Sequence, residues 1–212
     1  MADTALVARP NAAAEGNGRP GTRMGTTPAW FLTVSGAVGL VAAFVLLIEK
    51  LRLLSNPGYV PSCSINPVLS CGSIMRTDQA AVFGFPNPVL GVAAFSVLLT
   101  VGVVALTGAR LPAWFWWGTR AGATFGVVFV HWLIFQSLYR IGALCPYCMV
   151  VWVATIVAFV TTMGHAPKRN IGRAGISRWV AAYAPTTVVA WVTIIAALAT
   201  VRFWDYWSTL AS

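Results

Sequence analysis

The sequence predicts an all-α integral membrane protein, with a four-helix transmembrane bundle, a fifth transmembrane helix, and an outer loop with a short helix covering the bundle. Of its 212 residues, 58% are hydrophobic and only 9% are charged, and the mean hydropathy is +0.76. Soluble domains carry roughly 25% charged residues, so this composition indicates a chain that is solvated by lipid. The net charge of +9 comes mainly from basic residues in tails and connectors, which favours a role in membrane topology over nucleic-acid binding.

Five stretches without Asp, Glu, Lys or Arg supply the predicted spans. A helix that crosses a bilayer needs about 20 apolar residues, and the fourth stretch is the shortest, so we expect its helix to begin a turn earlier. The chain then divides into a disordered cytoplasmic tail over 1–27, a membrane bundle over 28–165 with an outer loop over 52–86, and a segment over 166–212 that holds a basic loop, the fifth helix and a short outer tail. The predicted spans are Pro28–Ile48, Val89–Leu106, Ala121–Leu138, Met149–Met163 and Trp179–Val201.

The four cysteines fall in two pairs on one side of the membrane. Two crossings separate the segment with Cys63 and Cys71 from the segment with Cys145 and Cys148, so both pairs face the same side. The other side has more basic residues, which predicts a cytoplasmic N-terminus and extracytoplasmic cysteines in a multi-pass protein of the cell (inner) membrane. Disulfides also persist outside the cytoplasm. The basic residues of the cytoplasmic side are Arg9, Arg19, Arg23, Arg110, Arg120, Lys168, Arg169, Arg173 and Arg178, and those of the cysteine side are Lys50, Arg52, Arg76, Arg140 and Arg202.

The motif Cys145-Pro146-Tyr147-Cys148 has the features of a redox pair. Two cysteines three residues apart at the start of a helix share one face and can close a small disulfide. The helix N-terminus stabilises a thiolate and lowers the pKa of the thiol, and a proline suits the first helical turn. The alternative is that these cysteines only pack as two small apolar residues at a helix end. The proline and the presence of the pair Cys63 and Cys71 disfavour it.

Cys63 and Cys71 form the other pair, with seven residues between them. The intervening Asn66-Pro67 favours a turn that brings the two cysteines together. A structural disulfide that staples the loop is the alternative. A zinc site is disfavoured, because structural zinc sites use closely spaced pairs and this spacing is too wide. The loop continues with Ile74–Phe85, which we expect to form a short amphipathic helix over the outer end of the bundle.

Four polar or aromatic residues in or at the ends of the predicted spans are candidates for a role beyond packing. Asn87 before Pro88 is explained as a helix N-cap, or as a donor to a quinone carbonyl. Trp152 shares a helix face with Cys148 and either packs in the bundle or stacks on a quinone ring. His131 and Gln136 lie within the third span, where polar groups find partners on other helices, and we do not expect them to be catalytic.

At these residues the chain resembles the vitamin K epoxide reductase family, in its bacterial branch. The match rests on Cys63-x7-Cys71, on Asn87-Pro-Val-Leu-Gly91 at the start of the second span, and on Cys145-Pro-Tyr-Cys148, and it covers roughly residues 28–165. The resemblance implies a four-helix bundle around a quinone of the menaquinone, ubiquinone or phylloquinone type. It implies that Cys148 faces the quinone and that Asn87, Leu90 and Trp152 bind it, with no metal.

The same resemblance implies an electron path through all four cysteines. Cys63 receives electrons from a partner protein, and Cys71 exchanges with Cys145. Many bacterial members continue into a thioredoxin-like domain, whereas this sequence ends at Ser212, so we expect a separate extracytoplasmic thioredoxin-fold oxidant as the partner. The expected function is oxidation of that partner with transfer of electrons to a membrane quinone. Reduction of a vitamin K or quinone epoxide, and a non-catalytic membrane protein with structural disulfides, are the alternatives.

Overall fold

The structure is a computed structural model that describes residues 21–165, 180 and 182–211. Five of its helices are long and apolar enough to cross a membrane, which confirms the predicted fold class. The long helices are α1 (Thr26–Ser55), α3 (Asn87–Leu106), α4 (Ala113–Phe135), α5 (Pro146–Gly164) and α7 (Ala184–Arg202). The short elements are α2 (Cys71–Met75), the 3₁₀ helix η1 (Asp78–Ala81), the π-helix η2 (Gln136–Ile141), which continues α4, and α8 (Trp204–Ala211).

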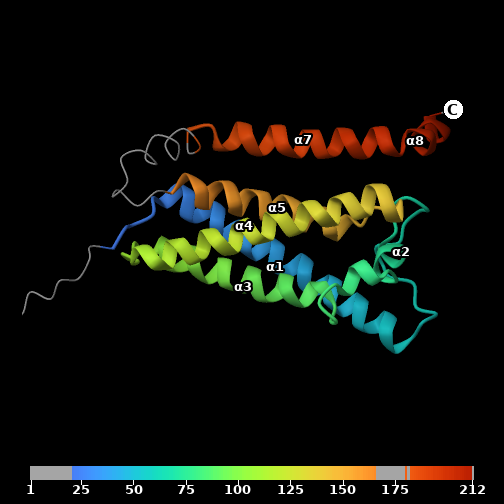
Figure 1. The fold of residues 1–212 in the computed structure, drawn as a ribbon, viewed down its shortest axis with the longest axis horizontal. Coiled ribbons are helices and arrows are strands. Elements are labelled where there is room, and N and C mark those ends of the chain that lie inside the picture. Colours follow the sequence, from blue (N-terminus) through green and yellow to red (C-terminus); the bar gives the residue numbers. More distant parts are fainter. Residues whose placement is uncertain (1–20, 166–179, 181, 212) are drawn as a thin grey trace, which may run out of the picture.

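Helix α1 is the centre of the bundle. It packs against α3 along one side and against α5 along another, and α4 packs against α5 (Figure 1). The segment with α2 and η1 covers one end of the bundle, as the sequence predicts, and the C-terminus lies at the same end (Figure 1). The expected single amphipathic helix over Ile74–Phe85 is instead split between α2, which already begins at Cys71, and η1.

Glycines allow α1 and α3 to approach each other closely. A Cβ atom added to Gly36 of α1 would lie 2.6 Å from the backbone N of Leu99 on α3. A Cβ atom added to Gly102 of α3 would lie 2.6 Å from the backbone N of Thr33 on α1. Small residues at helix interfaces let backbones meet in this way, so the two helices are in direct backbone contact at these glycines.

Two predicted spans extend past charged residues at which the sequence analysis placed their ends. α1 continues past Ile48 to Ser55 and so contains Glu49 and Lys50. α4 begins at Ala113 rather than Ala121, because Arg120 does not interrupt the helix. Its Nε atom donates to the backbone O of Thr162 on α5, at 3.2 Å. Both predictions failed because they excluded charged residues from the spans. The first span was ended before Glu49, and the third was begun after Arg120.

The end of the predicted disordered tail is ordered. Residues 1–20 lie outside the described part of the chain, but Thr22 pairs with Leu111, with N–H···O distances of 2.9 and 3.2 Å. The indole Nε1 of Trp116 donates to the backbone O of Thr22, and Met24 is buried. Disorder is therefore wrong for residues 21–27. Most of the basic loop after α5 also lies outside the described residues, as does the start of the predicted fifth span at Trp179.

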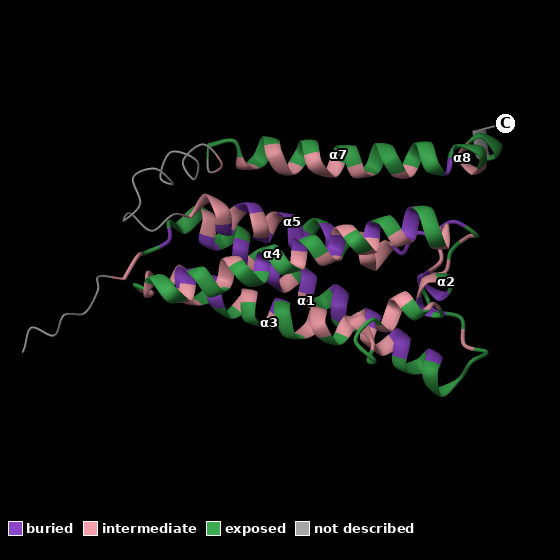
Figure 2. Ribbon diagram, viewed as in Figure 1, coloured by how far each residue is buried: buried purple, intermediate pink, exposed green. Residues whose placement is uncertain are grey.

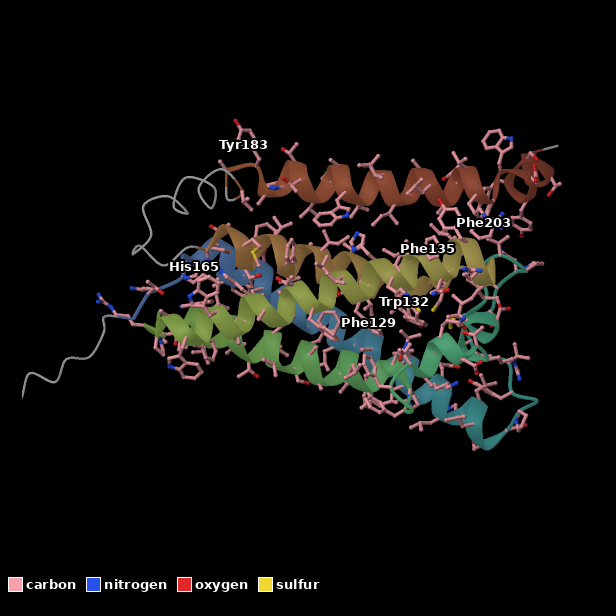
Figure 3. All side chains as sticks on the ribbon, in the orientation of Figure 1. Phe129, Trp132, Phe135, His165, Tyr183 and Phe203 are labelled. Carbon is pink, nitrogen blue, oxygen red and sulfur yellow. A yellow bond between two sulfur atoms is a disulfide. The ribbon has the colours of Figure 1, made fainter. Side chains whose placement is uncertain are left out.

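The fifth helix, α7, lies beside the bundle and contributes little to its core (Figures 1 and 2). None of its residues is buried. Two polar contacts hold it: the indole Nε1 of Trp191 donates to Nε2 of His131 on α4 at 2.9 Å, and Nε of Arg202 donates to the backbone O of Leu138 at 3.0 Å. Phe203, at the junction of α7 and α8, is buried against the bundle (Figure 3).

Gly36→Ala should destabilise the bundle by about 1–3 kcal/mol, because the added methyl group meets backbone atoms that cannot turn away. Gly118→Ala on α4 is the matched control, since its Cβ would have no neighbour within 4 Å. Thermal unfolding in detergent, followed by tryptophan fluorescence, measures both variants. Equal unfolding temperatures for the two variants would contradict the close α1–α3 packing.

Candidate redox site

The four cysteines lie together at the covered end of the bundle. Cys63 and Cys71 form a disulfide, with their Cα atoms 5.5 Å apart. The Sγ atom of Cys71 lies 3.0 Å from the Sγ atom of Cys145, and Cys148 follows in the first turn of α5. Cys71 and Cys145 are completely buried, and 4% of Cys63 is exposed. Two cysteine pairs that are 74 residues apart in sequence are therefore within reach of direct sulfur exchange.

A short parallel β-bridge brings the two pairs together. It joins Leu69, just before Cys71, to Leu144, just before Cys145. The N–H of Leu144 donates to the O of Val68 at 2.7 Å, and the N–H of Ser70 donates to the O of Leu144 at 2.8 Å. Because backbone pairing fixes the register of the two segments, it also fixes which sulfur atoms meet.

The predicted turn at Asn66-Pro67 is confirmed. The Oδ1 atom of Asn66 accepts hydrogen bonds from the N–H groups of Val68, at 3.0 Å, and Leu69, at 2.7 Å. Asparagine commonly closes turns through such bonds to the backbone. This turn reverses the chain between Cys63 and Cys71 and leads directly into the β-bridge.

Glu49, in the last turns of α1, anchors the segment before Cys63. Its carboxylate accepts hydrogen bonds from the Tyr59 hydroxyl at 2.9 Å, the Ser62 hydroxyl at 2.8 Å and the Ser62 N–H at 3.3 Å. Only 4% of Glu49 is exposed. Hydrogen bonds to a charged group are stronger than neutral ones, so this cluster holds the loop firmly against α1.

The approach to Cys145 depends on an irregular backbone. The π-helix η2 ends at Gly142, whose φ of 72° lies in the left-handed region that favours glycine. The Ser137 hydroxyl donates to the O of Ala143, and Arg202 of α7 donates to the O of Leu138. These bonds satisfy carbonyl groups near the turn and direct the chain into the start of α5.

Cys145 occupies the N-cap position of α5, with Pro146 in the first turn. Its Sγ atom accepts a hydrogen bond from the N–H of Cys148 at 3.4 Å. The hydrogen bond from the Cys148 side chain, together with the N–H groups of Cys148 and Tyr147, lowers the pKa of the Cys145 thiol although burial acts in the opposite direction. A helix N-terminus with such donors favours the thiolate, which is the nucleophile in disulfide exchange.

A largely apolar cavity of about 570 Å³ lies inside the bundle beside the cysteines. Helices α1, α3, α4 and α5 all contribute to its wall, and it extends along α4 from Gln136 to Trp114. On α4, Phe129 lies in this wall and stacks on Trp132, with the ring centroids 5.9 Å apart (Figure 3). Cavities of this size and character hold small apolar ligands, with a few polar groups to orient them. Among the lining residues are Cys148, Asn87, Leu90, Trp152, Lys50 and Gln136.

The three residues predicted to bind a quinone therefore line one cavity. Asn87 is not the N-cap of α3, as one interpretation expected: the cap position is Pro86 and Asn87 is the first helical residue. Its Oδ1 accepts from the N–H of Val82 at 3.1 Å and its Nδ2 donates to the O of Gln79 at 2.7 Å. The second N–H of the amide has no hydrogen-bond partner among the described residues. Trp152 is buried in the core while also facing the cavity.

The two polar residues of the third span have different surroundings. His131 accepts a hydrogen bond from Trp191 and so joins α4 to α7, which is the structural role between helices that the sequence favours. Gln136 lines the cavity, and its Oε1 atom is buried with no hydrogen-bond partner among the described residues. Sequence reasoning also overlooked Glu49 and Lys50. The available signal was two adjacent charges within an apolar helix, which is costly in a membrane and marks a site.

A bundle of membrane-spanning helices with a disulfide, a CxxC pair in sulfur contact and an adjoining apolar cavity defines a membrane protein of thiol redox chemistry. A comparison with family models matches the vitamin K epoxide reductase family over residues 30–163, and the chain belongs to this family. A comparison with curated proteins gives no significant match. Family membership makes the chain a multi-pass membrane oxidoreductase that acts through cysteines, in a family whose members generally use quinones. The matched region ends within α5, so α7 and α8 lie outside it.

Glu49→Gln should loosen the segment before Cys63, because the neutral amide replaces charge-assisted hydrogen bonds to Tyr59 and Ser62. The Cys63–Cys71 disulfide should then be reduced about tenfold faster by a water-soluble phosphine, since a loss of about 1.4 kcal/mol changes the open population tenfold. Tyr59→Phe, which removes one of the three hydrogen bonds to Glu49, should give a smaller increase. An unchanged reduction rate in Glu49→Gln would show that this carboxylate does not hold the loop.

Proposed function

We propose that this protein oxidises an extracytoplasmic thioredoxin-fold partner and passes the electrons through both cysteine pairs to a membrane quinone. The 3.0 Å contact between the sulfur atoms of Cys71 and Cys145 supports this proposal most directly. A disulfide that only stapled the loop would gain nothing from a second, unpaired thiol against one of its sulfurs. Cys145 and Cys148 are free thiols, and Cys148 lines the cavity, where a lipid-soluble acceptor would have access.

The proposed cycle begins with both pairs oxidised. The partner's dithiol reduces the Cys63–Cys71 disulfide and leaves as a disulfide. The Cys71 thiolate then attacks Cys145 of the Cys145–Cys148 disulfide, which forms a Cys71–Cys145 disulfide and releases the Cys148 thiolate. Cys63 attacks Cys71, which restores the Cys63–Cys71 disulfide and releases Cys145. The arrangement in the structure, with one disulfide and two free thiols, corresponds to this stage.

The last step returns the second pair to its disulfide. Cys145 and Cys148 lose their two thiol hydrogens and form a bond between their sulfurs, so two electrons and two protons leave the pair. A bound quinone accepts both and becomes a hydroquinone. The cavity fits such a group, because its wall is apolar along most of α4 and has polar side chains near Cys148. Asn87, Leu90 and Trp152 are the proposed contacts.

The proposed orientation puts the cysteines outside the cytoplasm. The larger number of basic residues on the opposite side supports this assignment, as does the persistence of a disulfide in an oxidising compartment. The loop over 52–86 then meets an extracytoplasmic partner at the end of the bundle, away from the lipid. Cys63 is the proposed entry point, because Cys71 is in contact with Cys145 and completely buried.

Cys148→Ala should leave part of the protein with a Cys71–Cys145 disulfide, because the Cys148 thiol that would displace Cys71 from Cys145 is absent and only Cys63 competes with Cys145 for Cys71. Mass spectrometry of the membrane-embedded protein under non-reducing conditions should find a Cys71–Cys145 disulfide in a substantial fraction of molecules, and reduction of a soluble quinone should be lost. Cys145→Ala is the matched control and should show only Cys63–Cys71. If Cys148→Ala also contained only Cys63–Cys71 beside a free Cys145, the first pair would be a staple and the relay would be wrong.

A further inference from the structure

We propose that Lys50 is a quinone-binding residue whose ammonium group hydrogen-bonds to a quinone oxygen and stabilises the negative charge that develops there during reduction. The inference rests on the proposed function, because it assigns a further residue of the same cavity. It depends on three features of Lys50: its burial, its lack of an acidic partner, and its position in the cavity wall.

Lys50 is buried although it is charged. It lies near the outer end of α1, only 9% of it is exposed, and it lines the same cavity as Cys148 and Asn87. Its Nζ atom donates a hydrogen bond to the backbone O of Met75, at 2.5 Å. An ammonium group has three donors, so this bond leaves two of them for other acceptors.

No carboxylate neutralises this charge in the described part of the chain. Glu49 is adjacent in sequence, but its oxygens accept from Tyr59 and Ser62. Successive residues of a helix point about 100° apart, so the two side chains serve different faces of α1. A buried charge without its counter-ion is unfavourable, and such residues within membrane spans usually serve substrates or ions.

A purely structural role accounts for only part of this arrangement. Met75 is the last residue of α2, and a cation near a helix C-terminus is favourable. A lysine could make that contact with Met75 while its ammonium group remained in water, so the contact does not explain why Lys50 is buried. The remaining donors of Lys50 instead belong to a side chain in the wall of an apolar cavity, where a ligand oxygen would satisfy them.

The charge of Lys50 suits the reaction that the cavity would accommodate. When Cys145 and Cys148 form their disulfide, two electrons enter the quinone and its oxygens become negative before the two protons released by the thiols neutralise them. A fixed positive charge in a site of low dielectric lowers the energy of that charged stage. Lys50 retains its own proton throughout. Asn87 offers one neutral N–H, because its other amide groups already bond to Gln79 and Val82.

Lys50→Gln tests this role, because glutamine keeps a donor for the carbonyl of Met75 but has no charge. The turnover number for a soluble short-chain quinone should fall about 100-fold, the magnitude that the loss of one electrostatic contact to a developing oxyanion produces. Quinone affinity, measured by quenching of tryptophan fluorescence in the full-length protein, should fall about tenfold. Lys50→Arg is the matched control, and should retain most of both properties because it retains the charge.

A second readout separates the quinone from the loop. The double variant Lys50→Gln/Cys148→Ala should form the Cys71–Cys145 disulfide to the same extent as the single variant Cys148→Ala. Unchanged quinone turnover and affinity in Lys50→Gln would overturn the inference. So would a loss of the Cys71–Cys145 disulfide, because Lys50 would then act by holding α2. If the unmodified protein did not reduce quinones at all, the proposed function itself would fail, which is a different result from either of these.

Discussion

The backbone pairing between Leu69 and Leu144 is the interaction on which the site depends. Two hydrogen bonds of 2.7 and 2.8 Å align the segment before Cys71 with the segment before Cys145, and the sulfur atoms come within 3.0 Å as a result. Neither segment belongs to a long helix, so each needs its own support. Glu49 holds one through Tyr59 and Ser62, and the π-helix with Gly142 directs the other. The long helices provide the frame that brings these supports together.

In the proposed function, this end of the bundle connects a thiol exchange with a soluble partner to the reduction of a quinone in the membrane. The loop with Cys63 lies beyond the apolar helices, whereas Cys148 lies in the wall of the cavity between them. Only two sulfur-to-sulfur steps separate these surroundings. Two adjacent charged residues near the end of α1 have different contacts: Glu49 holds the loop, and Lys50 faces the cavity and α2.

Hydrophobicity alone predicted the five membrane helices and the covering loop, because long apolar stretches have few other stable forms. Hydrophobicity placed two helix ends wrongly, at Arg120 and at Glu49. Both charged residues remain helical and bind partners that no local sequence pattern indicates. The cysteine motifs predicted which residues gather, but not the β-bridge that gathers them, since Leu69 and Leu144 are ordinary apolar residues. The cavity that Asn87, Gln136 and Lys50 line likewise depends on the packing of helices that are distant in sequence.

The order in which disulfides form tests the relay most directly. The fully reduced protein would be mixed rapidly with a short-chain quinone, quenched in acid at successive times, alkylated, and mapped by mass spectrometry. The relay predicts that Cys145–Cys148 forms first, that Cys71–Cys145 follows as a transient species, and that Cys63–Cys71 accumulates last. Appearance of Cys63–Cys71 while Cys145 and Cys148 stay reduced throughout would contradict it.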